Sequence, residues 1–193
     1  MSNKVEKSIT LDRRSFLGHS GKFVLSGTAI ALMSGMTPVK AMSADNSDLQ
    51  EQDIRILNTA IAAEHEAVAA YQLGAESGLL SKGVFNVAIQ FQGHHKEHIE
   101  LLASTVQTLG GDAIDAKSNY DFPVHKLKTE KNVLTFAAGL ERGAVSAYAG
   151  AIPLFNNSDL AKAAASILAD EAMHWAILRQ ALGLDPVPGA FFS

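Results

Sequence analysis

The residues best suited to chemistry lie near the C-terminal end of this 193-residue chain, in the run DEAMHW at 170–175. Glu171 and His174 are three residues apart in an Ala- and Leu-rich stretch with helical periodicity, so one face of a helix presents both side chains. A carboxylate on the apolar face of a helix is costly unless something compensates its charge. In helix bundles the compensation is commonly a metal ion, and Glu-x-x-His is a recurring ligand pattern. We therefore predict that this run supplies part of a metal site.

An internal repeat supplies two further carboxylates. Residues 57–71 match residues 134–148 at an offset of 77, with Leu, Glu, Ala, Val, Ala and Tyr in the same places. Each copy carries one Glu, Glu64 or Glu141, alone on an apolar stripe. A single such Glu would be expected at the edge of its stripe, where it reaches solvent. Two of them at equivalent positions of paired helices predict a buried and compensated site.

The segment between the two repeats carries a counterpart of the Glu-x-x-His pair. An offset of 76 aligns His95 and His98 with that pair and places both on the apolar stripe of their helix. An offset of 77 instead selects His94 and Glu97, which fall on a more polar face. We expect His95 and His98 to face inward, with His94 and Glu97 as the alternative pair.

These patterns together predict six inward-facing groups that bind metal. The predicted ligands are Glu64, His95, His98, Glu141, Glu171 and His174. Without compensation, each buried charge or unpaired imidazole would cost on the order of several kcal/mol. Carboxylates and imidazoles suit iron, manganese or zinc, and the chain has no Cys that could add a thiolate. Glu64 and Glu141 are predicted to bridge two metal ions about 3.5–4 Å apart.

Four helices are needed to position these side chains, and no strand alternation is present. Apolar periodicity predicts them over about 51–77, 84–109, 131–154 and 159–182. A short turn joins the two helices within each pair, and a long connection over 112–131 joins the first pair to the second. This order predicts an all-α, antiparallel four-helix bundle with a long crossover between the second and third helices. We expect 45–52 to form a mobile leader and Ser158 to cap the fourth helix.

The first 44 residues are typical of an export signal. A basic segment with the Arg13-Arg14 pair precedes an apolar run over 23–36, and small residues at Ala41 and Ala44 follow. This order predicts a twin-arginine signal peptide over 1–44, cleaved after Ala41 or Ala44, and a single domain over 45–193. A membrane anchor is the alternative, but the apolar run is too short to span a bilayer. We therefore expect the twin-arginine export machinery as a partner and the periplasm as the location.

The charge of the exported part excludes one class of function. Without residues 1–44 the chain has 10 Lys and Arg against 18 Asp and Glu. No basic patch remains that could hold a phosphate backbone, so nucleic acid is not expected as a partner.

Four motifs carry a resemblance to a known family. With Glu64, His95-x-x-His98, Glu141 and Glu171-x-x-His174, residues 50–183 resemble the ferritin-like superfamily, and more narrowly the exported ferritin-like domain proteins that include desiccation-related proteins. The resemblance implies an antiparallel four-helix bundle with two iron or manganese ions, and relatives with ferroxidase, peroxidase, catalase or oxygenase chemistry. One residue departs from the superfamily pattern, because His95 stands where the second helix usually has Glu. This exchange removes one negative charge and one carboxylate that could bridge two ions.

We therefore expect an exported dinuclear metal protein with oxidoreductase chemistry on oxygen or peroxide. Two alternatives stay open: a metal-binding or stress-protective bundle without turnover, and a metal-free scaffold that uses the tail at 191–192 for contacts. Assembly into an oligomer is compatible with each of these functions. Tyr71 and Tyr148, two turns beyond the repeated Glu residues, are expected to be core tyrosines with satisfied hydroxyls. The alternative is that they donate to the ligands or take part in redox chemistry.

Overall fold

Four long helices make up most of the computed structural model, which describes residues 46–192. They are α2 (Asn46–Glu76), α3 (Lys82–Thr108), α4 (Glu130–Ala151) and α5 (Ser158–Ala181), with short 3-10 turns η2 (Val124–Lys126) and η3 (Ile152–Leu154). Within the described residues no strand is present, which confirms the all-α prediction. No helix among them is long and apolar enough to cross a membrane. The predicted export signal at 1–44 lies outside the described residues.

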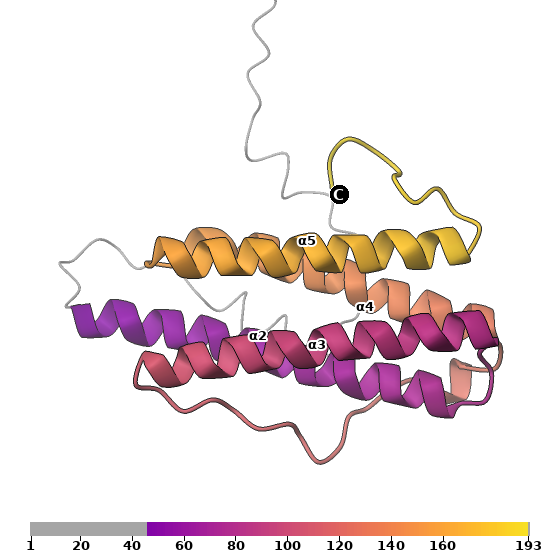
Figure 1. Cartoon of the computed structure of the whole chain (residues 1–193), viewed down its shortest axis with the longest axis horizontal. Coiled ribbons are helices and arrows are strands. Elements are labelled where there is room, and N and C mark those ends of the chain that lie inside the picture. The colour runs from indigo at the N-terminus through magenta and orange to yellow at the C-terminus, as the bar shows by residue number, and fades with distance from the viewer. Residues whose placement is uncertain (1–45, 193) are drawn as a thin grey trace, which may run out of the picture.

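The helices pack as two antiparallel pairs that are joined by a crossover (Figure 1). α2 packs against α3 and α4 against α5, while α2 also contacts α4 and α3 contacts α5. The connection between α3 and α4 returns along the length of the bundle, so these two helices run in the same direction (Figure 1). Each pair of helices in contact is therefore antiparallel, and the predicted four-helix bundle with a long crossover is confirmed.

The crossover begins at a pair of glycines and is held along α2. Gly110 has a positive φ of 75°, a conformation that glycine adopts easily. A Cβ at Gly111 would lie 2.9 Å from Cγ2 of Ile54, so the chain passes too close to α2 for a larger residue. Asn58 then fixes the crossover, because its side chain donates to the carbonyl of Asp112 at 3.0 Å and accepts from the amide of Ile114 at 3.0 Å.

The N-terminal end of α2 is part of the bundle, so the prediction of a mobile leader over 45–52 is wrong for 46–52. The side chain of Gln50 donates to the carbonyl of Leu109 at 2.6 Å, and that of Gln52 donates to the carbonyl of Leu154 at 2.8 Å. These contacts reach loops far away in the sequence, which is why local polarity gave no sign of them.

A buried carboxylate on α2 orders the turn between α4 and α5. Asp53 is buried and accepts from the amide of Asn156 at 2.8 Å and from the amide of Asn157 at 3.1 Å. Asn157 in turn caps α5, since its side-chain oxygen accepts from the amide of Asp159 at 2.8 Å. The predicted cap, Ser158, is the first residue of the helix instead.

The apolar core is divided into two clusters. One cluster gathers Leu57, Ile61, Leu102, Val106 and Ile167 with their neighbours, and the other gathers Tyr71, Phe91, Leu134, Ala138 and Leu178. On each helix the predicted metal ligands fall between the residues of the two clusters. The polar groups therefore lie in the middle of the bundle, with apolar packing on both sides that excludes water from them.

Candidate metal centre

All four helices contribute to one buried polar cluster at the middle of the bundle. Its members are Glu64 on α2, His95 and His98 on α3, Glu141 on α4, and Glu171 and His174 on α5. Five of the six are at most 2% exposed, and the side chain of His98 is 11% exposed. The structure thus brings together every residue that the sequence predicted as a ligand. Their binding of metal stays a prediction.

One half of the cluster gathers around Glu64. Its Oε2 lies 2.7 Å from Nδ1 of His95 and 3.3 Å from Nδ1 of His98. The same nitrogen of His98 lies 3.2 Å from Oε1 of Glu171. These four residues can each offer one ligand atom to a shared position, because those atoms all lie within 4.8 Å of one another.

The other half gathers around Glu141. Its Oε1 lies 3.4 Å from Nε2 of His95 and 3.5 Å from Nδ1 of His174. Glu171 reaches this half as well, with Oε2 at 3.6 Å from Nδ1 of His174. His95, Glu141, Glu171 and His174 form a second group whose ligand atoms lie within 4.8 Å of one another.

The two halves share Glu171 and His95, whereas the sequence predicted Glu64 and Glu141 as the bridging pair. Glu64 and Glu141 each belong to a single half, whereas Glu171 directs one oxygen toward each. A neutral imidazole has only one nitrogen lone pair, so His95 can serve one ion although it lies between both positions. The repeat relates Glu64 to Glu141 by symmetry, but it could not show that Glu171 of α5 contacts both halves.

Four buried atoms of this cluster have no hydrogen-bond partner: Nε2 of His95, both carboxylate oxygens of Glu171, and Nδ1 of His174. Buried polar atoms are nearly always paired, and an unpaired one costs about 1–3 kcal/mol. All four belong to groups that bind metals readily, and His95, Glu171 and His174 can bring ligand atoms within 4.8 Å of one another. The residues present therefore fit a bound cation.

Two tyrosine hydroxyls hold the carboxylates of the repeat across the bundle. The hydroxyl of Tyr71 on α2 donates to Oε1 of Glu141 on α4, and that of Tyr148 on α4 donates to Oε1 of Glu64 on α2 at 2.5 Å. Burial, followed by the neighbouring carboxylate charge, raises the pKa of each tyrosine well above its usual value. The prediction of core tyrosines with satisfied hydroxyls is confirmed, and their partners are two of the predicted ligands.

Asp170 is a residue of this site that the sequence reasoning missed. Its Oδ2 lies 3.2 Å from Nε2 of His174 and 3.4 Å from Nε2 of His98, the nitrogens that point away from the cluster. A carboxylate that accepts from the far nitrogen of a metal-binding histidine fixes the ring and its tautomer. The signal was available, because Asp170 precedes Glu171 and an offset of 76 relates it to His94.

The alternative pair on α3 does not enter the cluster. Glu97 is exposed, whereas the half-exposed His94 lies at the rim, with Nδ1 at 3.2 Å from Oδ2 of Asp170 and 2.9 Å from Nε2 of His174. The expectation that His95 and His98 face inward is therefore confirmed.

The carboxylates control the protonation of the three central histidines. Burial alone would lower the pKa of His95, but the neighbouring carboxylates of Glu141 and Glu64 outweigh it and raise the pKa to about 11. The same balance raises the pKa of His98 and of His174 to about 9. Burial alone would raise the pKa of Glu64 and of Glu141. The neighbouring histidines outweigh burial, so the pKa of both carboxyl groups is lowered. At neutral pH these three imidazoles are therefore protonated.

Comparison with known proteins agrees with the four-helix fold. The sequence profile of the ferritin-like domain family matches residues 52–184. The chain belongs to this ferritin-like domain family. The matched range covers all four helices except the first six residues of α2, and it includes every member of the polar cluster. A search among curated proteins finds no match.

Two solved structures share the ferritin-like fold. A conserved hypothetical protein from Mycobacterium tuberculosis is 20% identical, with a TM-score of 0.64, over 74% of this chain and 99% of its own. A ferritin-like, diiron-carboxylate protein from Bacillus anthracis str. Ames is 19% identical, with a TM-score of 0.61, over 72% of this chain and 99% of its own. At these identities the likeness establishes the fold of the ferritin-like domain and no more.

Proposed function

We propose that this protein is an exported dinuclear metal protein that holds two iron or manganese ions and carries out oxidoreductase chemistry on oxygen or peroxide. The observation that supports it is the set of unpaired, buried ligand atoms on His95, Glu171 and His174. One ion would be held by Glu64 and His98, and the other by Glu141, His174 and Nε2 of His95, with Glu171 shared between them.

The choice of metal follows from the donor atoms and their charge. Three carboxylates and three imidazoles without a thiolate suit iron or manganese. Three negative charges in a site from which water is excluded call for more than one divalent cation, because two such ions bring four positive charges. When bound, ions of this kind supply one-electron redox chemistry toward oxygen or peroxide.

The residues of the chain would bind the ions and orient the side chains that hold them. Tyr148 holds Oε1 of Glu64, so that its Oε2 faces His95 and His98. Asp170 lies within ion-pair distance of the outer nitrogens of His98 and His174, while their Nδ1 atoms face the inner carboxylates. The apolar clusters on both sides keep water away, and this strengthens every charge interaction within.

Metal analysis combined with one variant pair tests the proposal. Purified protein is expected to carry about two equivalents of iron or manganese, since two half-sites share Glu171. Glu171→Ala should lose most of this metal, whereas Glu97→Ala, which removes an exposed carboxylate near the site, should retain it. Loaded protein should consume oxygen or peroxide faster than the same metal free in solution. Protein that binds neither metal after reconstitution would rule the proposal out.

Export by the twin-arginine route, with the periplasm as destination, is part of the same proposal. The support is the sequence alone: Arg13-Arg14, the apolar run over 23–36, and the small residues at Ala41 and Ala44. A change of Arg13 and Arg14 to Lys should leave the protein in the cytoplasm, as cell fractionation would reveal. Export that is unaffected by this change would contradict the assigned route.

A second function, metal binding or stress protection without turnover, is favoured by one specific observation. His95 stands in the position between the two halves where a carboxylate could serve both ions. Such a centre would bind its ions tightly without consuming oxygen or peroxide faster than free metal does. The assay above separates the two functions.

A further inference from the structure

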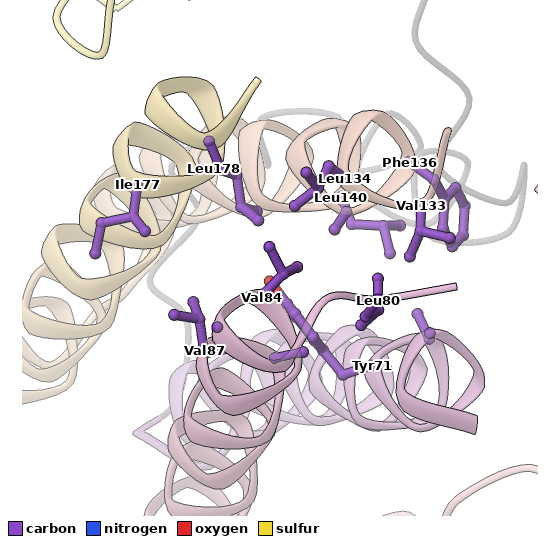
Figure 2. A pocket seen from close by; sticks show the side chains of 16 residues that line it. Tyr71, Leu80, Val84, Val87, Val133, Leu134, Phe136, Leu140, Ile177 and Leu178 are labelled. Carbon is purple, nitrogen blue, oxygen red and sulfur yellow. The ribbon is translucent and has the colours of Figure 1, made fainter. Parts of the chain in front are cut away.

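An apolar cavity of about 120 Å³ lies next to the polar cluster, toward the end of the bundle where α2 turns into α3. All four helices contribute to its wall. Figure 2 shows Val84 and Val87 of α3 on the side opposite Leu134 of α4 and Leu178 of α5, with Tyr71 next to Val84. Small residues leave this space open, since the lining includes Ala70, Gly74, Ala88, Ala137 and Ala181.

The cavity offers almost nothing to a polar molecule. Among the described residues that line it, Tyr71 alone has a polar side chain, and its hydroxyl already donates to Glu141. Water or peroxide inside would have to give up hydrogen bonds without replacement, which is unfavourable. A cavity of roughly 150 Å³ lined by Leu, Ile and Phe stays dry and binds benzene or xenon. The size and apolar lining found here are similar, and this cavity is in addition partly open to solvent at Ile177 and Ala181.

Tyr71 separates the cavity from the candidate metal centre. Its ring lines the cavity, while its hydroxyl contacts Glu141 and its ring centroid lies 5.4 Å from that of His95. A molecule in the cavity therefore contacts the same side chain that holds a predicted ligand. The polar rim formed by His94 and Asp170 lies elsewhere, between α3 and α5.

We propose that this cavity binds small apolar molecules and that dioxygen reaches the metal centre through it. The inference rests on the proposed function and narrows it, because it names dioxygen rather than peroxide as the oxidant. Dioxygen is small and apolar, so the cavity admits it, whereas peroxide has donors and acceptors that the lining cannot satisfy.

Xenon is the probe for the binding step, because it is apolar and needs no metal. The full chain should show a saturable xenon site by ¹²⁹Xe nuclear magnetic resonance. Ala137→Leu, which adds bulk inside the cavity, should abolish it, whereas Ala149→Leu on the exposed face of the same helix should not. Ala181→Leu fills the cavity from α5 and serves if Ala137→Leu fails to fold. Absence of xenon binding, or binding that survives a folded filling variant, would overturn the proposal.

The reactivity test compares two oxidants on iron-loaded protein. In a folded filling variant that binds iron normally, oxidation of bound Fe(II) by dissolved oxygen should slow about tenfold, while oxidation by peroxide should be unchanged. Equal slowing with both oxidants, or no slowing with oxygen, would contradict the assigned route. Failure of the proposed function looks different, because a chain that binds no metal would still bind xenon in the cavity.

Discussion

At the scale of single residues, the two tyrosines of the repeat connect its halves. Each donates to the carboxylate of the other copy, Tyr71 to Glu141 and Tyr148 to Glu64. For Glu64 this occupies Oε1 and leaves Oε2 toward the histidines. The hydroxyls thus fix the direction of the carboxylates. The cost of orienting them at the moment of binding is correspondingly smaller.

Tyr148→Phe is predicted to weaken metal binding while the fold is kept. The ring still packs in the core, but Oε1 of Glu64 loses the hydroxyl that holds it. Loss of such an outer hydrogen bond lowers metal affinity about 10- to 100-fold. Competition with a chelator of known affinity measures the change. Tyr120→Phe, in the crossover and outside the cluster, is the control and should bind metal normally.

Proton binding is predicted to compete with metal. His98 and His174 have a pKa of about 9 and His95 of about 11, against 6.5 for histidine in the unfolded chain. Metal must displace these protons, so apparent affinity should rise with pH between pH 6 and about 9. Calorimetry in buffers of different ionisation enthalpy would count the released protons. Metal affinity that is constant over this pH range would show that metal binding does not displace protons from the histidines.

The same shifts determine how the metal-free protein responds to pH. A pKa that is raised in the folded state stabilises the fold fully below the unfolded pKa of 6.5. This stabilisation is lost as pH rises through about 9 and then about 11. Metal-free protein should therefore unfold more easily at pH 10 than at pH 6, whereas loaded protein should show a smaller decline.

At the scale of elements, the sequence predicts the helices well and their tertiary contacts poorly. Apolar periodicity places α3, α4 and α5 to within a few residues, because each helix buries one continuous stripe. It misses the first turns of α2, whose Gln50 and Gln52 are held by loops remote in sequence. Asp53 gave no signal either, since its partners at 156–157 become neighbours only in the folded chain.

Asp53→Ala is predicted to destabilise the fold and leave the metal site intact. The change leaves the amides of Asn156 and Asn157 without their acceptor, which costs about 1–3 kcal/mol. Urea denaturation of the metal-free protein measures the loss. Asp48→Ala removes an exposed carboxylate in the first turn of the same helix and should change stability far less. Equal losses in the two variants would show that the turn at 156–157 does not depend on Asp53.

At the scale of the whole molecule, ligand types and spacing predict which residues meet, because a bundle brings equivalent stripes to its axis. They do not predict which residues belong to which half of the polar cluster. The position of Glu171 between the halves and of Asp170 behind the histidines depends on the rotation of α5 against α3. The apolar cavity is also absent from any pattern, since it results from small residues such as Gly74 and Ala137 on different helices.

Removal of metal is predicted to weaken the molecule as a whole, because the centre joins all four helices. An ion at about 100 times its dissociation constant stabilises the folded state by about 2.7 kcal/mol, or about 5–10 °C in midpoint for a domain of this size. Thermal unfolding with iron or manganese and with a chelator measures the difference. Glu171→Ala should unfold at the same temperature in both, because it lacks the carboxylate that both halves share. A wild-type shift no larger than that of this variant would mean that the four helices associate without metal, and the bundle would then be a scaffold.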